Sequence, residues 1–288
     1  MNGALAIFVK TAGHSPVKSR LAAMHGAAFA EDFHALAARA VASVALRAQA
    51  ALGITAYWAV AESTALDRWP GLPVIAQAQG GLGERMARVQ AQLVSRHGFG
   101  MLIGADAPQL SVGLLKQAHG WLAAPPSRLA LGPAADGGFW LFGANLAPPL
   151  ACWTHVEYSS ADTARDFTAS MKDLGQWHTL PTLTDADRSQ DLPIVLSELQ
   201  ALPETTDEQR ALAKWLGQHA TVQSDEDQRD PSDTALIPAQ AGNRGVDHSA
   251  AKPVSPRLSS GSRVLSLPND GDDEPEASAT STQQRIRT

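Results

Sequence analysis

The feature that most constrains the fold is an alternation of short apolar runs with longer segments of helical spacing. The apolar runs, which we expect to form strands, are residues 4–9, 54–61, 73–76, 101–103, 129–131, 139–142 and 177–183. The segments with helical spacing are residues 29–52, 82–96, 111–123, 162–174, 190–199 and 206–218. This alternation is typical of βαβ units. It predicts an α/β fold, a three-layer sandwich with a mainly parallel central sheet.

Aromatic residues divide the chain into two regions. All sixteen of them (seven Trp, two Tyr and seven Phe) precede residue 221. The region from residue 221 to 288 is rich in Pro, Ser, Gln, Asp and Gly, so it cannot bury enough apolar surface to offset chain entropy. We expect one folded domain over residues 1–220 and a disordered, acidic, Pro/Ser-rich tail over residues 221–288.

Charge and cysteine content exclude several function classes. The net charge is −6, and the tail supplies −4 of it through eleven acidic and seven basic residues, so no broad basic field for nucleic acid is expected. The single cysteine, Cys152, excludes a disulfide framework and a zinc site built from several thiolates. We find no signal peptide pattern and no apolar stretch near the roughly 20 residues that span a bilayer. The expectation is a cytoplasmic protein without a membrane span.

The loop after the first apolar run is a candidate phosphate site. Parallel strands end at one edge of a sheet, and ligands bind along that edge. Three cations, Lys10, Lys18 and Arg20, lie within eleven residues of this loop, and Gly13 allows a tight backbone path next to Thr11. Such cations hold phosphate oxygens well, although a solvated basic loop has the same composition.

A second candidate loop contains three glycines, Gly80, Gly81 and Gly83, at the start of the helical segment 82–96. Glycines at this place let a flat ligand such as a nucleotide approach the backbone closely. The alternative is a flexible turn that only caps the helix.

Aspartates follow several of the expected strands. Asp106 comes directly after the apolar run 101–103, and Ser111 is better placed than Asp106 to cap the next helix. Mg²⁺ and Mn²⁺ often need only one or two protein carboxylates, with phosphates and water as their other ligands. Asp185 and Asp187 lie in a later loop, where one caps a helix and the other could complete a metal site with Asp106.

The step Asp136-Gly137-Gly138 has two interpretations. It is either a simple hairpin turn or a carboxylate that faces the substrate, with glycines clearing space beside it. The histidines form no metal-binding motif, and no serine lies in a Gly-x-Ser-x-Gly elbow, so a hydrolase triad has no support.

Taken in order, these loops resemble the bacterial DUF2064 family, a glycosyltransferase-A-type family linked to arsenosugar biosynthesis. They are also similar to the phospholactate guanylyltransferases. The resemblance covers about residues 4–200. The motifs that carry it are Phe8-Val9-Lys10-Thr11-Ala12-Gly13, Ser15-Pro16-Val17-Lys18-Ser19-Arg20-Leu21, Gly81-Leu82-Gly83-Glu84-Arg85-Met86, Ile103-Gly104-Ala105-Asp106-Ala107-Pro108 and Gly132-Pro133-Ala134-Ala135-Asp136-Gly137-Gly138-Phe139.

The resemblance implies a fold of the GT-A, or nucleotide-diphospho-sugar transferase, type. It places the first loop, with Lys10, Lys18 and Arg20, beside the nucleotide phosphates. Asp106 matches a metal-binding aspartate at the end of the central strand. The Asp-rich segment that the family carries before its last helix corresponds to Asp185 and Asp187.

The function that we expect is transfer of a sugar from a nucleotide-diphospho-sugar donor to a small-molecule acceptor, with Mg²⁺ or Mn²⁺. Lys18 and Arg20 would stabilise charge on the leaving group, and Asp136 would act as the base. One alternative is a nucleotidyltransferase that joins a nucleotide to a phosphorylated acceptor and releases pyrophosphate. Another is a catalytically weak nucleotide-sugar binding protein, because Pro108 stands where an Asp-x-Asp motif needs its second acid.

Overall fold

The computed structural model describes residues 2–227, and within them seven strands form one sheet in the order β3-β2-β1-β4-β6-β5-β7. The strands are β1 Ala4–Val9, β2 Thr55–Val60, β3 Val74–Ala76, β4 Gly100–Gly104, β5 Arg128–Pro133, β6 Phe139–Ala144 and β7 Gln176–Thr179. Among these strands only β6 runs antiparallel to its neighbours, β4 and β5. The predicted mainly parallel sheet is confirmed.

The helices flank this sheet on both faces. They are α1 Ser19–His25, α2 Ala27–Leu52, η1 Ser63–Arg68, α3 Leu82–His97, α4 Val112–Leu122, α5 Ala151–Thr154, α6 Thr163–Ser170, α7 Asp191–Gln200 and α8 Asp207–Asp227. The predicted cap of α4 is confirmed, because the Ser111 hydroxyl accepts a hydrogen bond from the Leu114 N–H at 3.3 Å. At the start of α3, Glu84 accepts one from the Gly81 N–H at 2.8 Å.

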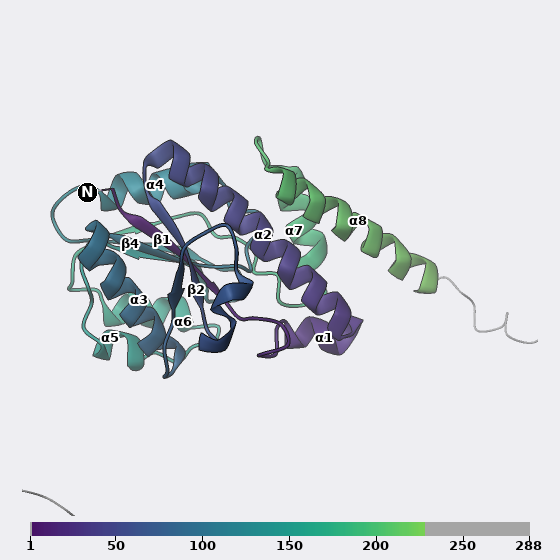
Figure 1. Cartoon of the computed structure of the whole chain (residues 1–288), viewed down its shortest axis with the longest axis horizontal. Coiled ribbons are helices and arrows are strands. Elements are labelled where there is room, and N and C mark those ends of the chain that lie inside the picture. The colour runs from purple at the N-terminus through teal and green to yellow at the C-terminus, as the bar shows by residue number, and fades with distance from the viewer. Residues whose placement is uncertain (1, 228–288) are drawn as a thin grey trace, which may run out of the picture. The chain divides into compact units, whose positions relative to one another are not determined.

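Alternate residues of β1 pack into two different cores, which produces the three layers. Leu5, Ile7 and Val9 pack with α2 and α4, whereas Ala4 and Ala6 pack with α3, α5 and α6. In Figure 1 these two groups of helices lie on opposite sides of the sheet. A third core joins the outer face of α2 to α1, α7 and α8.

Several element boundaries differ from the sequence-based expectation. Gly26, with φ 87°, separates a short helix α1 from α2, so the segment expected to be one loop contains a helix. Strand β7 ends at Thr179 rather than near 183, because Pro181 has no N–H for the ladder. Helix α8 continues through residues 221–227, where the tail was expected to begin, and the rest of that expected tail lies outside the described residues.

Helix α2 corrects the expectation that no stretch is apolar enough for a membrane. By length and composition alone, it is long and apolar enough to cross one. Within the structure it contributes core residues on two sides: Val41, Val44 and Ala45 pack on the sheet, and Phe33 and Ala37 pack against α1, α7 and α8. Its Ala-rich sequence favours the helix and lets it lie close to the strands.

Gly83 provides a test of the packing between α3 and α5. A methyl group added there would lie 2.3 Å from the backbone oxygen of Trp153, which cannot move away as a flexible side chain could. We expect Gly83→Ala to lower the free energy of unfolding by about 1–3 kcal/mol in chemical denaturation. The matched control is Gly120→Ala in α4, where no atom lies within 4 Å of the added methyl group. There the alanine should raise the free energy of unfolding by about 0.5–1 kcal/mol. Equal effects of the two substitutions would contradict the described packing.

Candidate functional site

A cleft of about 480 Å³ lies at the edge of the sheet where the parallel strands end. We call it the sheet-edge cleft. Four segments meet there: the loop after β1, the loop after β4, the turn from β5 to β6, and the loop that follows β7. The cleft is lined by Phe8, Val9, Lys10, Pro16, Val17, Lys18, Ser19, Arg20, His34, Gln77, Leu82, Arg85, Gly104, Ala105, Asp106, Asp136, Ser159, Asp185 and Asp187.

Lys18 is the centre of the ion pairs in this cleft. Its Nζ lies 2.7 Å from Oδ1 of Asp106 and 3.7 Å from Oδ1 of Asp185, and only 5% of its side chain is exposed. The Lys18 backbone is left-handed, with φ 45° and ψ 48°, a conformation that costs a lysine roughly 1 kcal/mol or more. This uncommon backbone directs the ammonium inward, so the loop after β1 is joined to the loops after β4 and β7.

Arg20 makes the second ion pair of the same loop. Its Nη1 lies 2.5 Å from Oδ2 of Asp187. The segment that carries Asp185 and Asp187 is fixed in turn to the β4 loop, because the Ala186 N–H donates to the carbonyl oxygen of Asp106 at 3.1 Å. The structure thus brings together Lys18, Arg20 and all three aspartates predicted to bind metal. Asp187 pairs with Arg20, whereas Asp106 and Asp185 pair with Lys18.

Lys18, which is buried, and the partly exposed Asp106 and Asp185 shift one another's pKa values. Burial raises the pKa of Asp106, but the Lys18 ammonium outweighs it, so this pKa lies below its usual value. Burial lowers the pKa of Lys18, but Asp106 and Asp185 outweigh it and raise that pKa above its usual value. At Asp185, burial and then the Asp106 charge raise the pKa to about 7. The result is one firm ion pair beside a carboxyl group that is half protonated near neutral pH.

Two carboxylates of this cleft fit a divalent cation. Oδ1 of Asp185 is buried and receives no hydrogen bond, and it faces the same ammonium as Asp106. No three His, Cys, Asp or Glu side chains among residues 2–227 are grouped so that they could hold a metal ion by themselves. Mg²⁺ commonly takes one or two carboxylates and completes its shell with phosphate oxygens and water. Asp106 and Asp185 therefore suit a cation that arrives with a phosphorylated ligand.

Asp136 lies in the hairpin turn between β5 and β6, as the first interpretation of its Asp-Gly-Gly step expected, and its role toward a substrate stays a prediction. Its Oδ1 accepts a hydrogen bond from the Gly138 N–H at 2.9 Å, and its side chain is exposed in the cleft. Gly137 is required in this turn: its φ is 93°, and an added methyl group would lie 2.1 Å from the Ala161 oxygen. Asp136 forms no ion pair with the residues that the structure describes.

A second pocket, of about 290 Å³, opens beside the cleft. We call it the apolar pocket. Its walls come from β1, α3, β4, β6 and the segment before α6. The residues that line it are Phe8, Leu82, Met86, Leu102, Ile103, Gly104, Asp106, Ala107, Ala134, Asp136, Gly138, Phe139, Trp140, Tyr158, Ser159, Thr163 and Asp185. Asp106, Asp136 and Asp185 line both spaces, so the carboxylates lie at their junction.

Sequence reasoning missed three polar residues of the cleft. His34 of α2 is 7% exposed and donates to the Lys10 carbonyl oxygen at 2.8 Å, so it supports the first loop. Gln77, after β3, is buried, and its Oε1 accepts a hydrogen bond from Nη1 of Arg85 at 3.1 Å. Arg85 belongs to a motif that carried the family resemblance, so that motif was the available signal.

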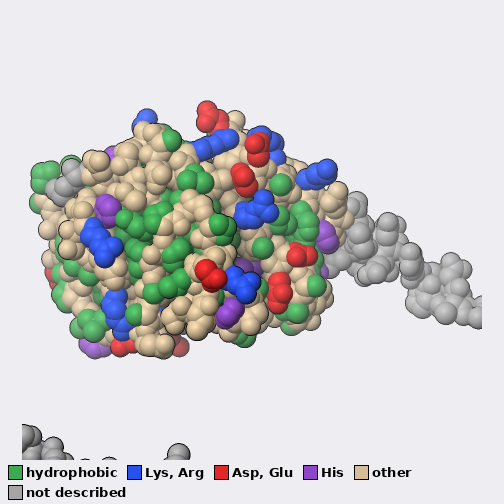
Figure 2. Space-filling model, in the orientation of Figure 1, with side chains coloured by type: hydrophobic (Ala, Val, Ile, Leu, Met, Phe, Trp, Pro, Cys, Tyr) green, Lys and Arg blue, Asp and Glu red, His purple; other side chains and the backbone are tan. Residues whose placement is uncertain are grey.

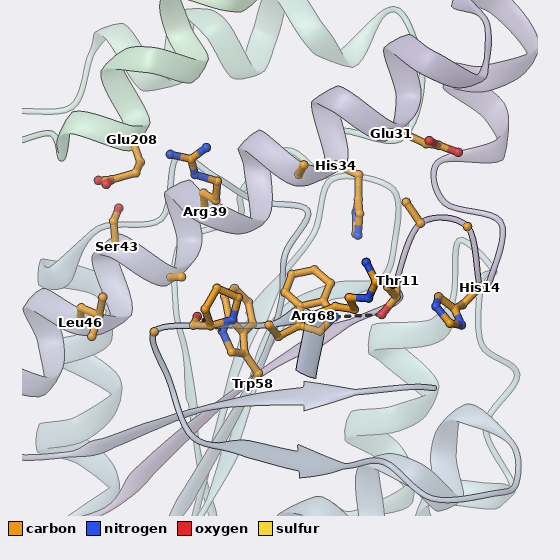
Figure 3. A pocket seen from close by; sticks show the side chains of 17 residues that line it. Thr11, His14, Glu31, His34, Arg39, Ser43, Leu46, Trp58, Arg68 and Glu208 are labelled. Atoms are coloured by element: carbon orange, nitrogen blue, oxygen red, sulfur yellow. Dashed lines mark hydrogen bonds between the residues drawn. The ribbon is translucent and has the colours of Figure 1, made fainter. Parts of the chain in front are cut away.

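A larger cavity of about 880 Å³ lies between α2, η1 and the loop after β1. Figure 3 shows Arg39, Ser43 and Glu208 on one side of it and Thr11 and His14 on the other. Despite its size, none of the aspartates of the cleft lines it. The aspartates predicted from the sequence therefore meet in the smaller cleft and not in this cavity.

The structure does not bring every predicted nucleotide-binding residue to the sheet-edge cleft. Thr11 and Gly13 line the larger cavity instead. The Thr11 N–H donates to Glu62 and its hydroxyl accepts from Trp69, each at 2.9 Å, so both groups already have partners. Gly80, Gly81 and Gly83 do not line the cleft either, although Leu82 of the same segment does.

The face drawn in Figure 2 carries lysine and arginine side chains singly or beside acidic ones. The sheet-edge cleft, by contrast, is lined by four cations, Lys10, Lys18, Arg20 and Arg85.

The raised pKa of Asp185 predicts how stability changes with pH. Its carboxyl titrates at 3.8 in its ordinary state and at about 7 when folded, so the folded protein holds the extra proton between these values. The free energy of unfolding should therefore fall as the pH rises through this window. We expect Asp185→Asn to remove this loss of stability. At pH 8 the free energy of unfolding should rise by about 1 kcal/mol, which corresponds to a rise in Tm of roughly 2–4 °C.

The gain from Asp185→Asn should be absent at pH 4 and should level off above pH 7 in differential scanning fluorimetry. Asp173→Asn, which alters an exposed side chain outside the cleft, is the matched control. A gain of equal size at pH 4 and pH 8 would contradict the assigned burial of the Asp185 charge.

Comparisons with known proteins agree with this fold. The model of the family described as an uncharacterized protein conserved in bacteria, DUF2064, matches residues 19–160. A structure from Desulfovibrio desulfuricans G20, provisionally named a nucleotide-diphospho-sugar transferase, has a TM-score of 0.64 and 22% identity, and covers 77% of this chain and 97% of its own. This likeness shows the fold of this chain.

More distant structures share less of the geometry. CMP:2-keto-3-deoxy-manno-octonic acid synthetase, complexed with CTP, has a TM-score of 0.40 and 11% identity, with 69% of this chain and 99% of that chain covered. 4-Diphosphocytidyl-2C-methyl-D-erythritol synthase from Anaerococcus prevotii DSM 20548 has a TM-score of 0.38 and 9% identity, with 69% of this chain and 100% of that chain covered. No curated protein matches the chain.

Proposed function

Residues 19–160 belong to the DUF2064 family, and from this premise we propose that the chain is a glycosyltransferase that takes its sugar from a nucleotide-diphospho-sugar. One observation carries the proposal. A cation-lined cleft and an apolar pocket meet at three carboxylates, Asp106, Asp136 and Asp185, at the ligand-binding edge of the sheet. That arrangement offers separate places for an anionic donor and for an acceptor.

The cleft suits the diphosphate of the donor. Lys10, Lys18, Arg20 and Arg85 line it, and lysine and arginine hold phosphate oxygens with charge-assisted hydrogen bonds. Lys18 is almost fully buried, so its charge is screened little by water. Its role in the reaction is to stabilise the charge that develops on the diphosphate as the bond to the sugar breaks.

Asp106 and Asp185 are the residues that would hold Mg²⁺ or Mn²⁺ beside the diphosphate. The cation would neutralise part of the negative charge on the leaving group. Lys18 lies between these two carboxylates, with its Nζ 2.7 Å from Oδ1 of Asp106 and 3.7 Å from Oδ1 of Asp185, and so holds them near each other. Asp187 holds Arg20 in the same way through their ion pair.

Asp136 is suited to activate the acceptor. Its exposed carboxylate lies between the cleft and the apolar pocket and has no ion-pair partner among the described residues. It would take the proton of an acceptor hydroxyl as the hydroxyl oxygen forms its bond to the anomeric carbon. The bond from that carbon to the diphosphate oxygen breaks, and the electron pair leaves with the nucleoside diphosphate.

This base also favours sugar transfer over nucleotidyl transfer. In nucleotidyl transfer to a phosphorylated acceptor, the attacking phosphate is already ionised at neutral pH and needs no base. A second anion would also have to approach Asp136, which carries no compensating cation. An alcohol has neither problem, because it brings no charge and has a proton to lose.

The products distinguish these reactions. The purified protein would be incubated with Mg²⁺, a mixture of small alcohols and, separately, UDP-, GDP- and ADP-sugars or the four NTPs. The nucleotide products would be followed by ³¹P NMR and the glycosylated alcohol by mass spectrometry. We expect a nucleoside diphosphate and a glycosylated alcohol from one of the sugar donors. Pyrophosphate release from an NTP would replace this proposal with nucleotidyl transfer. Binding of a donor without any product would leave a nucleotide-sugar binding protein.

A further inference from the structure

The apolar pocket differs from the adjoining cleft in its charge. Among the residues that the structure describes, no lysine, arginine or histidine lines this pocket, whereas the cleft is lined by five such side chains, Lys10, Lys18, Arg20, His34 and Arg85. The ionisable groups of the pocket are Tyr158 and the three aspartates at its mouth. Asp106 and Asp185 pair with Lys18 of the cleft, whereas Asp136 forms no ion pair with a described residue. A negatively charged ligand would therefore meet the Asp136 carboxylate and find no lysine, arginine or histidine within the pocket.

Three polar side chains on the pocket walls already make hydrogen bonds within the protein. The Trp140 Nε1–H donates to the Pro181 oxygen at 3.0 Å, and the Tyr158 hydroxyl donates to the Trp153 oxygen at 2.8 Å. The Thr163 hydroxyl is bonded to backbone oxygens at 2.9 Å. These three side chains therefore present mostly apolar surface to a ligand.

Aromatic packing fixes the shape of the wall formed by β6 and α6. Phe139 stacks on Phe167 with ring centroids 4.8 Å apart, and Phe167 is fully buried. Phe8, Met86 and Leu102 add further apolar surface to the lining. At about 290 Å³, the pocket lies at the small end of the range for small-molecule sites, with room for one ring or a short aliphatic chain.

We propose that the apolar pocket is the acceptor subsite, and that it selects an uncharged or positively charged hydroxyl compound with an aromatic or aliphatic body over phosphate esters and carboxylic acids. The choice of occupant rests on the proposed function, because only a transferase needs an acceptor here. The selection by charge rests on the lining of the pocket alone. Asp136 contributes to both, since it repels anions at the place where it would take the proton of a hydroxyl.

Three fluorinated probes test the selection by charge in the full-length protein. They are 4-fluorophenethyl alcohol, 4-fluorophenethylamine and 4-fluorophenyl phosphate, which share one ring and differ in charge. The spectra are recorded with inorganic pyrophosphate present, so that the cation-lined cleft is occupied and the phosphate probe cannot bind there. In ligand-observed ¹⁹F NMR, we then expect the alcohol and the amine to bind and the phosphate to bind at least about tenfold more weakly. Equal or tighter binding of the phosphate would overturn the proposal, and so would the absence of binding by both other probes.

Two variants locate the probes. Phe139→Ala removes one wall and should weaken binding of the alcohol probe about tenfold. Leu150→Ala, at a mostly exposed residue outside the pocket, is the control and should leave that binding unchanged. Leu82→Lys places a cation at the mouth of the pocket. Leu82 is 39% exposed, so the site tolerates a lysine, and the variant should bind the phosphate probe about fivefold more tightly than the wild type. If neither variant alters binding, the probes occupy another site and the proposal is wrong.

Failure of the proposed function would be visible separately. Melting temperatures with nucleotide-sugars are measured on the same samples without probes. If no nucleotide raises Tm but the probes follow the expected order, the transferase proposal fails and the charge selection of the pocket stands. If nucleotides bind and the phosphate probe binds best, the reverse holds.

Discussion

Replacement of Lys18 by methionine is expected to lower transfer activity by a factor of roughly 10²–10³. Methionine is similar in length and apolar, so the buried part of the side chain keeps its packing while the charge is lost. Asp106 and Asp185 then face each other without a counter-ion, and the diphosphate loses its most buried cation. We expect kcat to fall and the stabilisation by donor nucleotide to decrease, measured by product formation and by thermal shift.

Stability must be controlled in this experiment, because Lys18 also compensates two carboxylates. At pH 8 the variant should unfold at a lower temperature than the wild type, since an ion pair with a buried partner has been broken. Circular dichroism checks that the variant is folded at the assay temperature. Lys172→Met, which removes an exposed cation outside the cleft, should change neither activity nor nucleotide binding. A folded Lys18→Met variant with wild-type activity would remove this lysine from the mechanism.

Replacement of Asp106 by asparagine is expected to cause the second large loss, that of metal-dependent nucleotide binding and of activity. Asparagine keeps the shape and one acceptor oxygen but removes the charge that a divalent cation needs. Mn²⁺ should increase the nucleotide-induced rise in Tm of the wild type, and this metal-dependent increment should disappear in the variant. Activity should fall by roughly 10²-fold or more, because the leaving group loses its charge compensation.

Asp187→Asn separates this role from a general effect of negative charge in the cleft. Asp187 pairs with the half-exposed Arg20 rather than with Lys18, so its loss should weaken donor binding moderately and leave the Mn²⁺ increment in place. If Asp106→Asn keeps the full increment, Asp106 is not a metal ligand. If Asp187→Asn abolishes it, the metal site includes the aspartate that the structure assigns to Arg20.

The general position of the site could be predicted from sequence because of a rule about parallel strands. Lys18, Asp106 and Asp185 are far apart in the chain, but each follows an apolar run that forms a strand of one parallel set, β1, β4 or β7. Strands of one direction end at the same edge, so residues after them meet in space. The structure confirms this meeting through the ion pairs at 2.7 and 3.7 Å.

The roles of individual residues in the first two loops could not be predicted in the same way. Glycine content indicates where a backbone can bend, but not whether it bends toward a ligand or toward another helix. At Gly83 the missing side chain makes room for the Trp153 backbone, and Thr11 is bound to Glu62 and Trp69. These contacts depend on which elements pack together, and no local pattern contains that information.

The left-handed backbone of Lys18 was also beyond sequence reasoning. Lysine rarely adopts φ near 45°, so nothing in its identity predicted the conformation that turns the ammonium inward. His34 and Arg85 were missed for another reason. Each lies on a helix whose spacing predicts the helix but does not show which residue reaches the end of a neighbouring strand.

The central claim is that the sheet-edge cleft binds the diphosphate of a nucleotide-activated sugar through Lys18. It is tested most directly by isothermal titration calorimetry of UDP-, GDP- and ADP-sugars with Mn²⁺, on the wild type and on Lys18→Met. We expect that at least one sugar nucleotide binds the wild type, that the matching nucleoside without phosphates does not, and that the sugar nucleotide binds Lys18→Met at least about tenfold more weakly. Binding of equal strength to the wild type and the variant, or no binding of any sugar nucleotide, would contradict it.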